Sequence, residues 1–323
     1  MPRTRVYRDG ALEAEGFPIS DVSTYIADPS ATVWVDLYRP RADDLAAISE
    51  ELGLHRLAVE DAIHEHQRPK LDRYDTHLFV TAYAVRLDPA TGVLDAYEVA
   101  AFITANALVT VRKDEGFDID AVLARWDGSS DLAKYGVSFL VHGLLDDVVD
   151  THFEAVQALD EQIEGLQDQL FADRPQTRAL QLRTFELRKS LVLLRRIVLP
   201  MREVVNSLLR RDLRVVHEAM QPYFQDVYDH VLRASEWTES LRDLVSTVLE
   251  TNLTMQSNRL NVIMKQVTSW AAIIAVPTAV TGFYGQNVPY PGFGHPIGFW
   301  TSTVVTTGAS IGLFWYFRRK NWI

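Results

Sequence analysis

The chain has 323 residues, of which 47% are hydrophobic and 23% are charged, and its formal net charge is -11. An acidic surface repels nucleic acid and raises the local concentration of cations, so the charge disfavours a nucleic-acid partner. Plain solubility explains an acidic surface equally well. The sequence contains no cysteine, which excludes disulfides and thiolate metal sites.

The charged residues are distributed unevenly along the chain. Residues 266–317 contain no Asp, Glu, Lys or Arg. A soluble domain rarely runs about fifty residues without a charge, because its outer face must meet water. The first sixteen residues have no apolar core of signal-peptide length, so we expect the N-terminus to stay on the side where the chain is made.

Residues 1–133 have the pattern of an α+β domain with a mixed sheet. Four segments rich in β-branched and aromatic residues predict strands at 33–37, 77–87, 97–106 and 107–113. Pro89 and Gly92 between the second and third segments predict a hairpin turn. Residues 41–54 show a helical pattern that ends near Gly53. Helices packed on a sheet are the natural outcome.

Residues 134–221 predict an antiparallel helical hairpin with arms of opposite charge. Residues 135–173 contain nine acidic side chains and no Lys or Arg, whereas residues 174–214 contain eleven basic and three acidic ones. Asp173, Arg174 and Pro175 break the pattern between the arms. Two interpretations stay open: the arms neutralise each other, or the acidic arm faces a cation path.

A third helix is predicted to begin near Pro222 and to run as a stalk to residue 284. Apolar or small residues recur in it at alternating spacings of four and three, which is a heptad seam suited to assembly. The seam comprises Val227, Val231, Ala234, Thr238, Leu241, Val245 and Val248.

Two segments near the C-terminus are long and apolar enough to cross a membrane. They are residues 262–284 and 297–317, joined by a Pro- and Gly-rich loop at 285–296 and followed by a basic tail at 318–323. Basic residues flank the pair and are absent from the loop, so both termini are expected to be cytoplasmic. Small and polar residues in the first segment allow close helix packing or line a wet path. Two helices cannot enclose a pore, so the second interpretation requires an oligomer.

Several separated segments resemble the CorA magnesium-transporter family. They are EDAIHEHQRPKLDRYD (60–75), DQLFADRP (168–175), PYFQDVYDH (222–230) and PTAVTGFYGQNVPY (277–290). Members carry Tyr-Gly-Met-Asn where this chain has Tyr284, Gly285, Gln286 and Asn287. The resemblance implies a funnel-shaped homopentamer in the plasma (inner) membrane. It implies influx of Mg²⁺, and also of Co²⁺ or Ni²⁺, with no enzymatic activity and no organic cofactor.

The motif residues would then form the selectivity filter. Mg²⁺ gives up its water reluctantly, so a ring of Asn287 amide oxygens would accept hydrogen bonds from the hydrated ion. Gly285 would allow close backbone approach, and Tyr284 would hold the loop. The alternative role for Asn287 is that of a helix C-cap.

The resemblance also implies a pore-lining face and a regulatory site. The face comprises Asn261, Met264, Val267, Thr268, Ala271, Ala275, Thr278 and Gly282. Met264 and Val267 would form an apolar constriction, with ordinary helix packing as the alternative. Asp88 and Asp226 would bind intracellular Mg²⁺ between neighbouring subunits and close the gate, with solvated surface acids as the alternative.

Departures from the family pattern leave the ion open. Gln286 replaces the usual Met, Ala275 stands where many members place a bulky residue, and the outer loop has no acid. A zinc or proton-coupled cation transporter of the same superfamily is the main alternative.

Rivals of other classes are a non-conducting scaffold and a membrane-anchored metal-dependent enzyme. The enzyme would use the dense run of His55, Glu60, Asp61, His64 and His66, although no HExxH pattern occurs.

Overall fold

The computed structural model describes residues 2–64, 67–170, 177–210, 213 and 215–323. These residues form two compact units, one ending at Val248 and the other comprising Leu249–Ile323. The break that we predicted at Asp173, Arg174 and Pro175 lies outside the described residues, as does His66.

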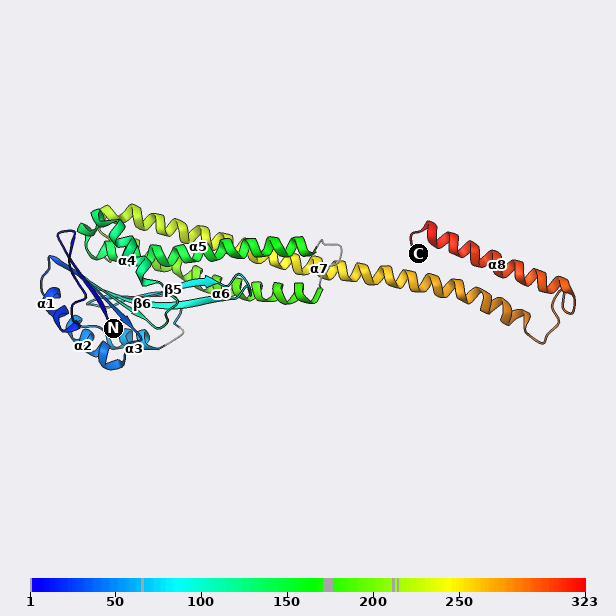
Figure 1. Cartoon of the computed structure of the whole chain (residues 1–323), viewed down its shortest axis with the longest axis horizontal. Coiled ribbons are helices and arrows are strands. Elements are labelled where there is room, and N and C mark those ends of the chain that lie inside the picture. The colour runs from blue at the N-terminus through cyan, green and yellow to red at the C-terminus, as the bar shows by residue number, and fades with distance from the viewer. Residues whose placement is uncertain (1, 65–66, 171–176, 211–212, 214) are drawn as a thin grey trace. The chain divides into compact units, whose positions relative to one another are not determined.

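The N-terminal unit is built on a seven-stranded mixed sheet (Figure 1). Its strands are β1 (Arg3–Arg8), β2 (Ala11–Glu15), β3 (Ala31–Tyr38), β4 (Lys70–Arg73), β5 (Leu78–Leu87), β6 (Leu94–Ile103) and β7 (Ala107–Arg112). They lie in the order β2-β1-β3-β7-β6-β5-β4. The β3–β7 pair is parallel and the other pairs are antiparallel.

Helices cover both faces of the sheet because its strands alternate between two hydrophobic cores. In β3, Val33 and Val35 belong to a core shared with α1 (Val22–Ile26), α2 (Ala42–Leu52) and α3 (Arg56–Ile63). Trp34 points to the other core, where it meets Trp126 of α4 (Ile119–Gly128) with the rings edge to face at 5.1 Å. The second core is closed by α4, α5 (Val137–Leu170), α6 (Thr177–Leu209) and the first part of α7 (Gln221–Tyr284).

The sequence pattern predicted the fold class correctly, and several elements as well. The four predicted strands correspond to β3, β5, β6 and β7, and the predicted hairpin turn joins β5 to β6. The helix predicted at 41–54 is α2, which ends at Gly53 in the left-handed conformation with φ 60°. The sequence pattern did not predict strands β1, β2 and β4. In β1, arginines stand at positions where a search for strands expects apolar residues, so the alternation of apolar and polar residues is not apparent.

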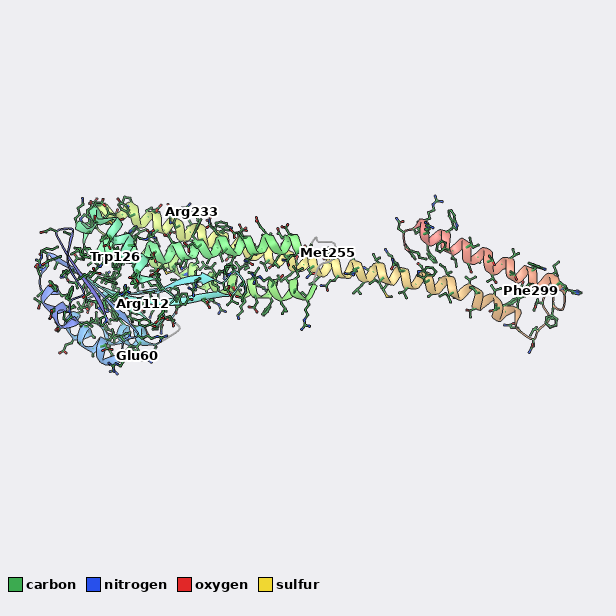
Figure 2. The ribbon with its side chains drawn as sticks, viewed as in Figure 1. Glu60, Arg112, Trp126, Arg233, Met255 and Phe299 are labelled. Atoms are coloured by element: carbon green, nitrogen blue, oxygen red, sulfur yellow. The ribbon has the colours of Figure 1, made fainter. Side chains whose placement is uncertain are left out.

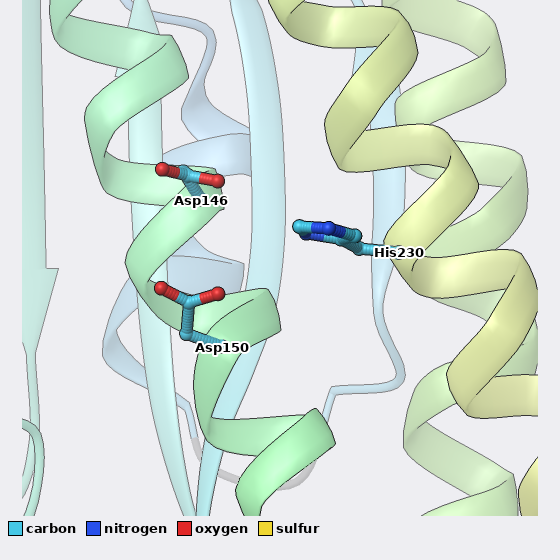
Figure 3. Close-up of side chains that lie close together, drawn as sticks. All are labelled: Asp146, Asp150 and His230. Carbon is cyan, nitrogen blue, oxygen red and sulfur yellow. The ribbon is translucent and has the colours of Figure 1, made fainter.

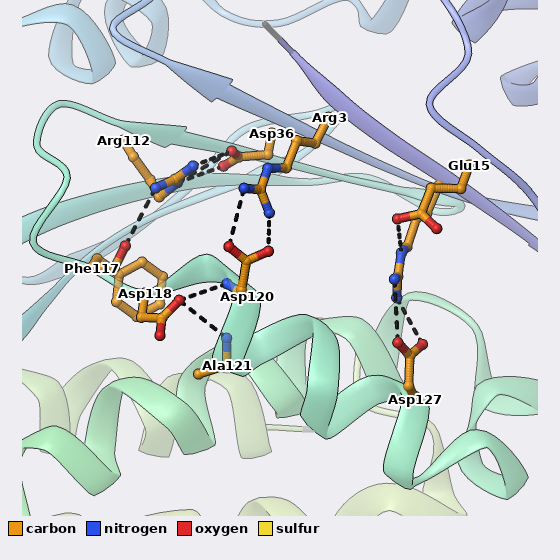
Figure 4. Close-up of polar contacts among 10 residues, drawn as sticks. Arg3, Glu15, Asp36, Arg112, Phe117, Asp118, Asp120, Ala121 and Asp127 are labelled. Atoms are coloured by element: carbon orange, nitrogen blue, oxygen red, sulfur yellow. Dashed lines mark hydrogen bonds and ion pairs between the residues drawn. The ribbon is translucent and has the colours of Figure 1, made fainter.

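Two of those arginines, Arg3 and Arg5, are paired with acids of α4 (Figure 4). Arg5 lies almost fully buried in β1 and donates to Asp127 at 2.8 Å and to Glu15 of β2 at 3.0 Å. Arg3 pairs with Asp120 in the first turn of α4. The strand therefore joins the sheet through ion pairs that a search for apolar residues does not detect.

The heptad seam of α7 is used inside the chain, which corrects its predicted role in assembly. All seven seam residues are buried, with at most 3% of their surface exposed. Six of them belong to the core shared with α5 and α6, and the hydroxyl of the seventh, Thr238, donates to the carbonyl of Ala234. Burying a Val or Leu side chain stabilises a fold by about 1.5 to 3 kcal/mol, so the seam holds the helical hairpin to α7. It is not a free surface for a second copy.

The charges of the hairpin are also arranged differently from the neutralisation that we considered. Among the described residues, no ion pair joins α5 to α6. The acids at the start of α5 instead pair with Arg125 of α4, and Arg195 of α6 pairs with Glu239 of α7. The hairpin is held by its apolar core and by a hydrogen bond from Arg183 to Gln162.

A buried histidine makes the N-terminal unit sensitive to acid. His152 of α5 is fully buried, and its Nε2 lies 2.7 Å from the carbonyl oxygen of Tyr83. Burial lowers the pKa of His152 to about 4. An unfolded histidine titrates at about 6.5, so the stability given by the neutral ring is complete above that pH and is lost as the pH falls toward 4.

We expect the free energy of unfolding to fall by about 2 kcal/mol between pH 6.5 and pH 5 through this group. The variant His152→Gln keeps an N–H donor for the Tyr83 carbonyl but does not titrate, so that part of the pH dependence should disappear. Chemical unfolding of the full-length protein in detergent at both pH values measures it. If the free energy of unfolding of His152→Gln fell with pH as steeply as that of the unchanged protein, His152 would not be the group responsible.

The C-terminal unit contains two apolar helices. They are the remainder of α7, which ends at Tyr284, and α8 (Pro296–Arg319). Both helices are long and apolar enough to cross a membrane, and only 6% of the most apolar stretch of each is buried. The contrast is plain in Figure 2: Trp126 lies inside the N-terminal unit, whereas Phe299 projects from α8 and is 67% exposed.

Candidate functional site

The Tyr-Gly-Gln-Asn segment lies where α7 ends. The Gly285 N–H donates to the carbonyl of Thr281 at 2.8 Å, which closes the last turn. A Cβ atom on Gly285 would lie 2.9 Å from that carbonyl oxygen, so a larger residue would have to shift the backbone. Glycine is therefore required for the tight exit from the helix.

Aromatic rings hold the loop that follows. The ring of Tyr284 meets Tyr290 edge to face with centroids 4.9 Å apart, and Tyr290 meets Phe293 at 5.3 Å. Tyr284 is half-buried, while the next two residues, Gly285 and Gln286, are exposed. These ring contacts pack the loop against the end of α7.

The amide groups of the motif are free. Within the described part of the chain, neither Gln286 nor Asn287 makes a side-chain hydrogen bond, and both residues are exposed. A C-cap would use the Asn287 amide to satisfy a helix carbonyl. Since no such bond forms, the amide oxygen of Asn287 is available to a ligand.

The predicted pore-lining residues share an exposed face of α7. All eight are exposed, among them Met264 at 63% and Val267 at 59%. A different face of α7 carries buried Ser269 and the half-buried Ala272, Ile273, Val276 and Val280. Trp270 meets Phe314 of α8 with ring centroids 6.3 Å apart. In the single chain, α8 thus covers one side of α7 and leaves the predicted lining uncovered.

Hydroxyl groups on α7 are oriented by the helix backbone. Thr278 donates to the carbonyl of Ile274 at 3.2 Å, and Thr281 donates to the carbonyl of Pro277 at 2.8 Å. Each hydroxyl proton is used in this way, so the lone pairs of the oxygen face outward. Such an oxygen can accept a hydrogen bond from water, as a hydrated cation requires.

Asp88 lies in the turn between β5 and β6 and is held by that turn. Its carboxylate accepts from the Ala90 N–H at 2.9 Å and from the Thr91 hydroxyl at 2.6 Å. These bonds, the Thr91 hydroxyl first, lower the pKa of Asp88 below its usual value. The group is therefore a fixed, charged carboxylate. No hydrogen bond or ion pair within the described residues joins it to Asp226.

Asp226 lies one helical turn before His230, which belongs to a cluster of ionisable side chains that the sequence analysis did not predict. Its side chain is 66% exposed, with Oδ2 4.0 Å from Nε2 of His230. His230 faces Asp146 and Asp150 of α5, and one ligand atom from each of the three lies within 4.8 Å of the others (Figure 3). The PYFQDVYDH segment contains the histidine, but its acidic partners come from a helix about eighty residues away.

An arginine already neutralises these acids. Arg125 of α4 pairs with Asp146 and lies 2.6 Å from Asp150. Asp147 in the same turn lies 3.7 Å from the guanidinium, and burial raises the pKa of Asp147 to about 6. These acids thus have a protein cation as their partner, whereas the exposed carboxylate of Asp226 has no Lys or Arg partner among the described residues and lies near His230 alone.

The residues of the enzyme alternative have structural roles. His55 caps the N-terminus of α3 through its Nδ1 and stacks on Tyr74 with centroids 4.6 Å apart. Asp61 pairs with Lys70 at 2.5 Å. His64 bonds the carbonyl of Glu60 at 2.8 Å. In the described ranges these residues do not converge on one metal position.

Comparisons with known proteins agree with this arrangement. The family described as CorA-like Mg2+ transporter protein matches residues 29–319. The chain is 29% identical over 316 residues to the cobalt/magnesium transport protein CorA of Thermotoga maritima, covering 96% of this chain and 90% of the relative. It is 25% identical over 269 residues to the zinc transport protein ZntB of Pectobacterium carotovorum, covering 79% and 77%.

The fold is also that of a solved structure. The complete CorA magnesium transporter from Methanocaldococcus jannaschii matches with a TM-score of 0.80 at 22% sequence identity, covering 100% of this chain and 99% of the other. The sheet with its helices, the long helix and the two apolar C-terminal helices are common to both. The chain belongs to the CorA-like Mg²⁺ transporter family, whose members are inner-membrane transporters of divalent cations and not enzymes.

Proposed function

We propose that this chain forms a channel that admits Mg²⁺, and also Co²⁺ or Ni²⁺, down the electrochemical gradient. The observation that carries the proposal is the exposed face of α7, together with the free amide of Asn287 in the loop that follows the helix. Both termini would lie in the cytoplasm, since basic residues such as Arg259 and Arg318 flank the apolar segments and the loop between them has none.

The proposal requires several copies of the chain. Two helices per chain cannot enclose a water-filled path, and an uncovered face with polar groups is costly in lipid. A ring of copies, with α7 inside and α8 outside, would turn the predicted lining toward a common axis. Following the family resemblance, we take the ring to be a homopentamer.

Selection would occur at the motif. The amide oxygens of Asn287 would accept hydrogen bonds from the waters of the ion, which suits a cation that dehydrates reluctantly. Thr278 and Asn261 would offer further oxygens along the path. Met264 and Val267 would narrow it by an apolar ring able to exclude water.

Gln286 bears on which ion is preferred. It replaces the Met of the family motif, and its exposed amide adds a donor and an acceptor beside Asn287. This observation keeps zinc transport as the second candidate. Influx of Mg²⁺, Co²⁺, Ni²⁺ and Zn²⁺ into liposomes containing purified protein decides between them. Preference for Zn²⁺ over Mg²⁺ would overturn the magnesium assignment, and the variant Gln286→Met shows whether the substitution sets the order.

Intracellular Mg²⁺ would close the channel by joining neighbouring subunits. Asp88 is a charged carboxylate held by its turn, and Asp226 is exposed with no Lys or Arg partner among the described residues, which makes them suited to share an ion across an interface. Mg²⁺ would bridge the two groups, which otherwise repel each other. Loss of the ion would loosen the cytoplasmic ring and open the gate.

We expect Asp226→Lys to weaken closure by internal Mg²⁺, raising the concentration that halves influx by roughly tenfold, a change equivalent to about 1.4 kcal/mol. The matched control is Asp229→Lys, which reverses an exposed charge one position before His230 on the same helix. Protection from protease by Mg²⁺ provides a second readout. Unchanged inhibition and unchanged protection in Asp226→Lys would argue against a sensor at this position.

A further inference from the structure

The outer side of α5 carries an acidic face. Glu154, Glu161, Glu164 and Asp168 are exposed and are separated by intervals of seven, three and four residues, which places them on one side of the helix. The buried residues of α5, such as Leu159 and Ile163, lie on the opposite side. We call these four residues the acidic face.

The outer side of α6 carries a basic and apolar face. Leu182, Phe185 and Val192 recur at intervals of three and seven residues and are 61%, 62% and 39% exposed. Four exposed cations surround them: Arg178, Arg188, Lys189 and Arg196. We call these seven residues the basic face. An exposed Leu and Phe one turn apart, at the centre of a charged surface, are typical of a binding site.

Neither face is neutralised within the chain. Among the described residues, the four acids and the four cations make no ion pair, although the two helices pack together. Other charges of the hairpin do have partners: Arg195 pairs with Glu239, and Arg183 bonds Gln162 and the carbonyl of Pro89. The two faces thus present four negative and four positive charges to the surroundings.

We propose that the basic face of α6 in one copy docks on the acidic face of α5 in a second copy. The charges of the two faces are equal in number and opposite in sign, which is the complementarity that fixes partner and register. Leu182, Phe185 and Val192 would be buried at the centre of the contact, inside a rim of ion pairs. The inference rests on the proposed function, which requires an oligomer.

The geometry of this contact leads to a ring. Each copy contacts one neighbour through its basic face and the other neighbour through its acidic face, so the contact is heterologous. When the ring closes, both faces of every copy are paired. The seam of α7, which has the pattern of an assembly surface, is buried inside the chain and cannot perform this task. The faces of α5 and α6 supply a surface in its place.

An anionic membrane is the competing occupant of the basic face. Arginines, lysines and apolar side chains on one helix face are also typical of helices that lie on lipid. The neighbouring helix α5 carries the acidic face, however, and anionic headgroups repel it. A second copy satisfies both faces, whereas a lipid surface satisfies one.

Cross-linking of the full-length protein tests the contact, and the absence of native cysteine makes it specific. Differently tagged chains carrying Glu161→Cys and Phe185→Cys are expressed together, purified in detergent and treated with a bifunctional maleimide. We expect a product joining the two tags, and little product when either variant is expressed alone, because a heterologous contact does not bring identical positions together. The matched control pairs Phe185→Cys with Glu51→Cys on the exposed side of α2.

Charge reversal gives an independent readout. Arg188→Glu with Lys189→Glu should weaken association about tenfold or more, and Glu161→Lys with Glu164→Lys should do the same. The chain carrying all four changes should recover the oligomer, since the charges are complementary again. Reversal of Glu50 and Glu51 to Lys on α2 is the control that should leave assembly unchanged.

The outcomes separate this inference from the proposed function. An oligomer that conducts cations without the α5–α6 cross-link and without recovery in the fourfold variant would overturn the docking alone. A protein that neither assembles nor conducts would overturn both. Protection of Phe185→Cys from labelling by anionic but not neutral lipid, without any cross-link, would assign the basic face to the membrane and refute docking between copies.

Discussion

Asn287→Ala should abolish cation influx while leaving assembly intact. The Asn287 amide is exposed and makes no hydrogen bond within the described residues, so its removal costs the fold little. Each amide that accepts from an ion-bound water contributes about 1 kcal/mol, and every copy in the ring loses one. Over five copies the sum is about 5 kcal/mol, which corresponds to a capture of the ion more than roughly 1,000-fold weaker.

The measurement is Mg²⁺ influx into liposomes containing equal amounts of the two proteins, with native mass spectrometry to establish the number of copies. Asn206→Ala, which removes an exposed amide from α6, is the matched control and should conduct normally. Normal influx through Asn287→Ala would refute the role of this residue in selection. Loss of influx together with loss of the oligomer would assign it to assembly instead.

Arg112→Met should lower the free energy of unfolding of the N-terminal unit by more than a substitution of an exposed residue does. Asp36 of β3 is 1% exposed, and its carboxylate is held by Arg112 of β7 at 2.6 Å and 3.0 Å and by the hydroxyl of Thr110 at 2.8 Å (Figure 4). Removing the guanidinium leaves a buried charge without its partner. Such a change costs about 3 to 5 kcal/mol.

The double variant Asp36→Leu with Arg112→Met distinguishes a lost ion pair from a lost shape. Replacing both partners by apolar residues is often neutral, so we expect most of the stability to return. Arg56→Met, at an exposed arginine on α3, is the control and should change stability by about 0.5 kcal/mol or less. The free energy of unfolding in detergent measures all three. A single variant as stable as the control would contradict the buried-pair account.

The sequence predicted those parts of the fold that rest on apolar periodicity. Strands β3, β5, β6 and β7 and the apolar helices α7 and α8 have uninterrupted or alternating apolar residues, and they were found near their observed positions. Strand β1 was missed because Arg5 enters the core with its acidic partners. The α7 seam was found, but its partner was not, because a heptad pattern records an apolar face without saying what covers it.

The residues of the candidate site also fall into those that the sequence could predict and those that it could not. Gly285, Asn287 and the α7 face follow from one continuous segment, so a motif and a helical period suffice to predict them. The group formed by Asp146, Asp150 and His230 depends on how α5 packs against α7, which no local pattern encodes. The acidic and basic charges of α5 and α6 were apparent in the sequence. Only the structure shows that, among the described residues, the charges of the acidic face and of the basic face form no ion pairs with each other.

The most direct test of the central claim is Mg²⁺ influx into liposomes as a function of an imposed membrane potential. An inside-negative potential of 100 mV favours entry of a divalent ion by about 4.6 kcal/mol. A channel of the proposed kind should therefore admit Mg²⁺ without any nucleotide, and faster as the interior becomes more negative. If purified protein embedded in the bilayer gave no influx above that of empty liposomes at any potential, the account would be contradicted.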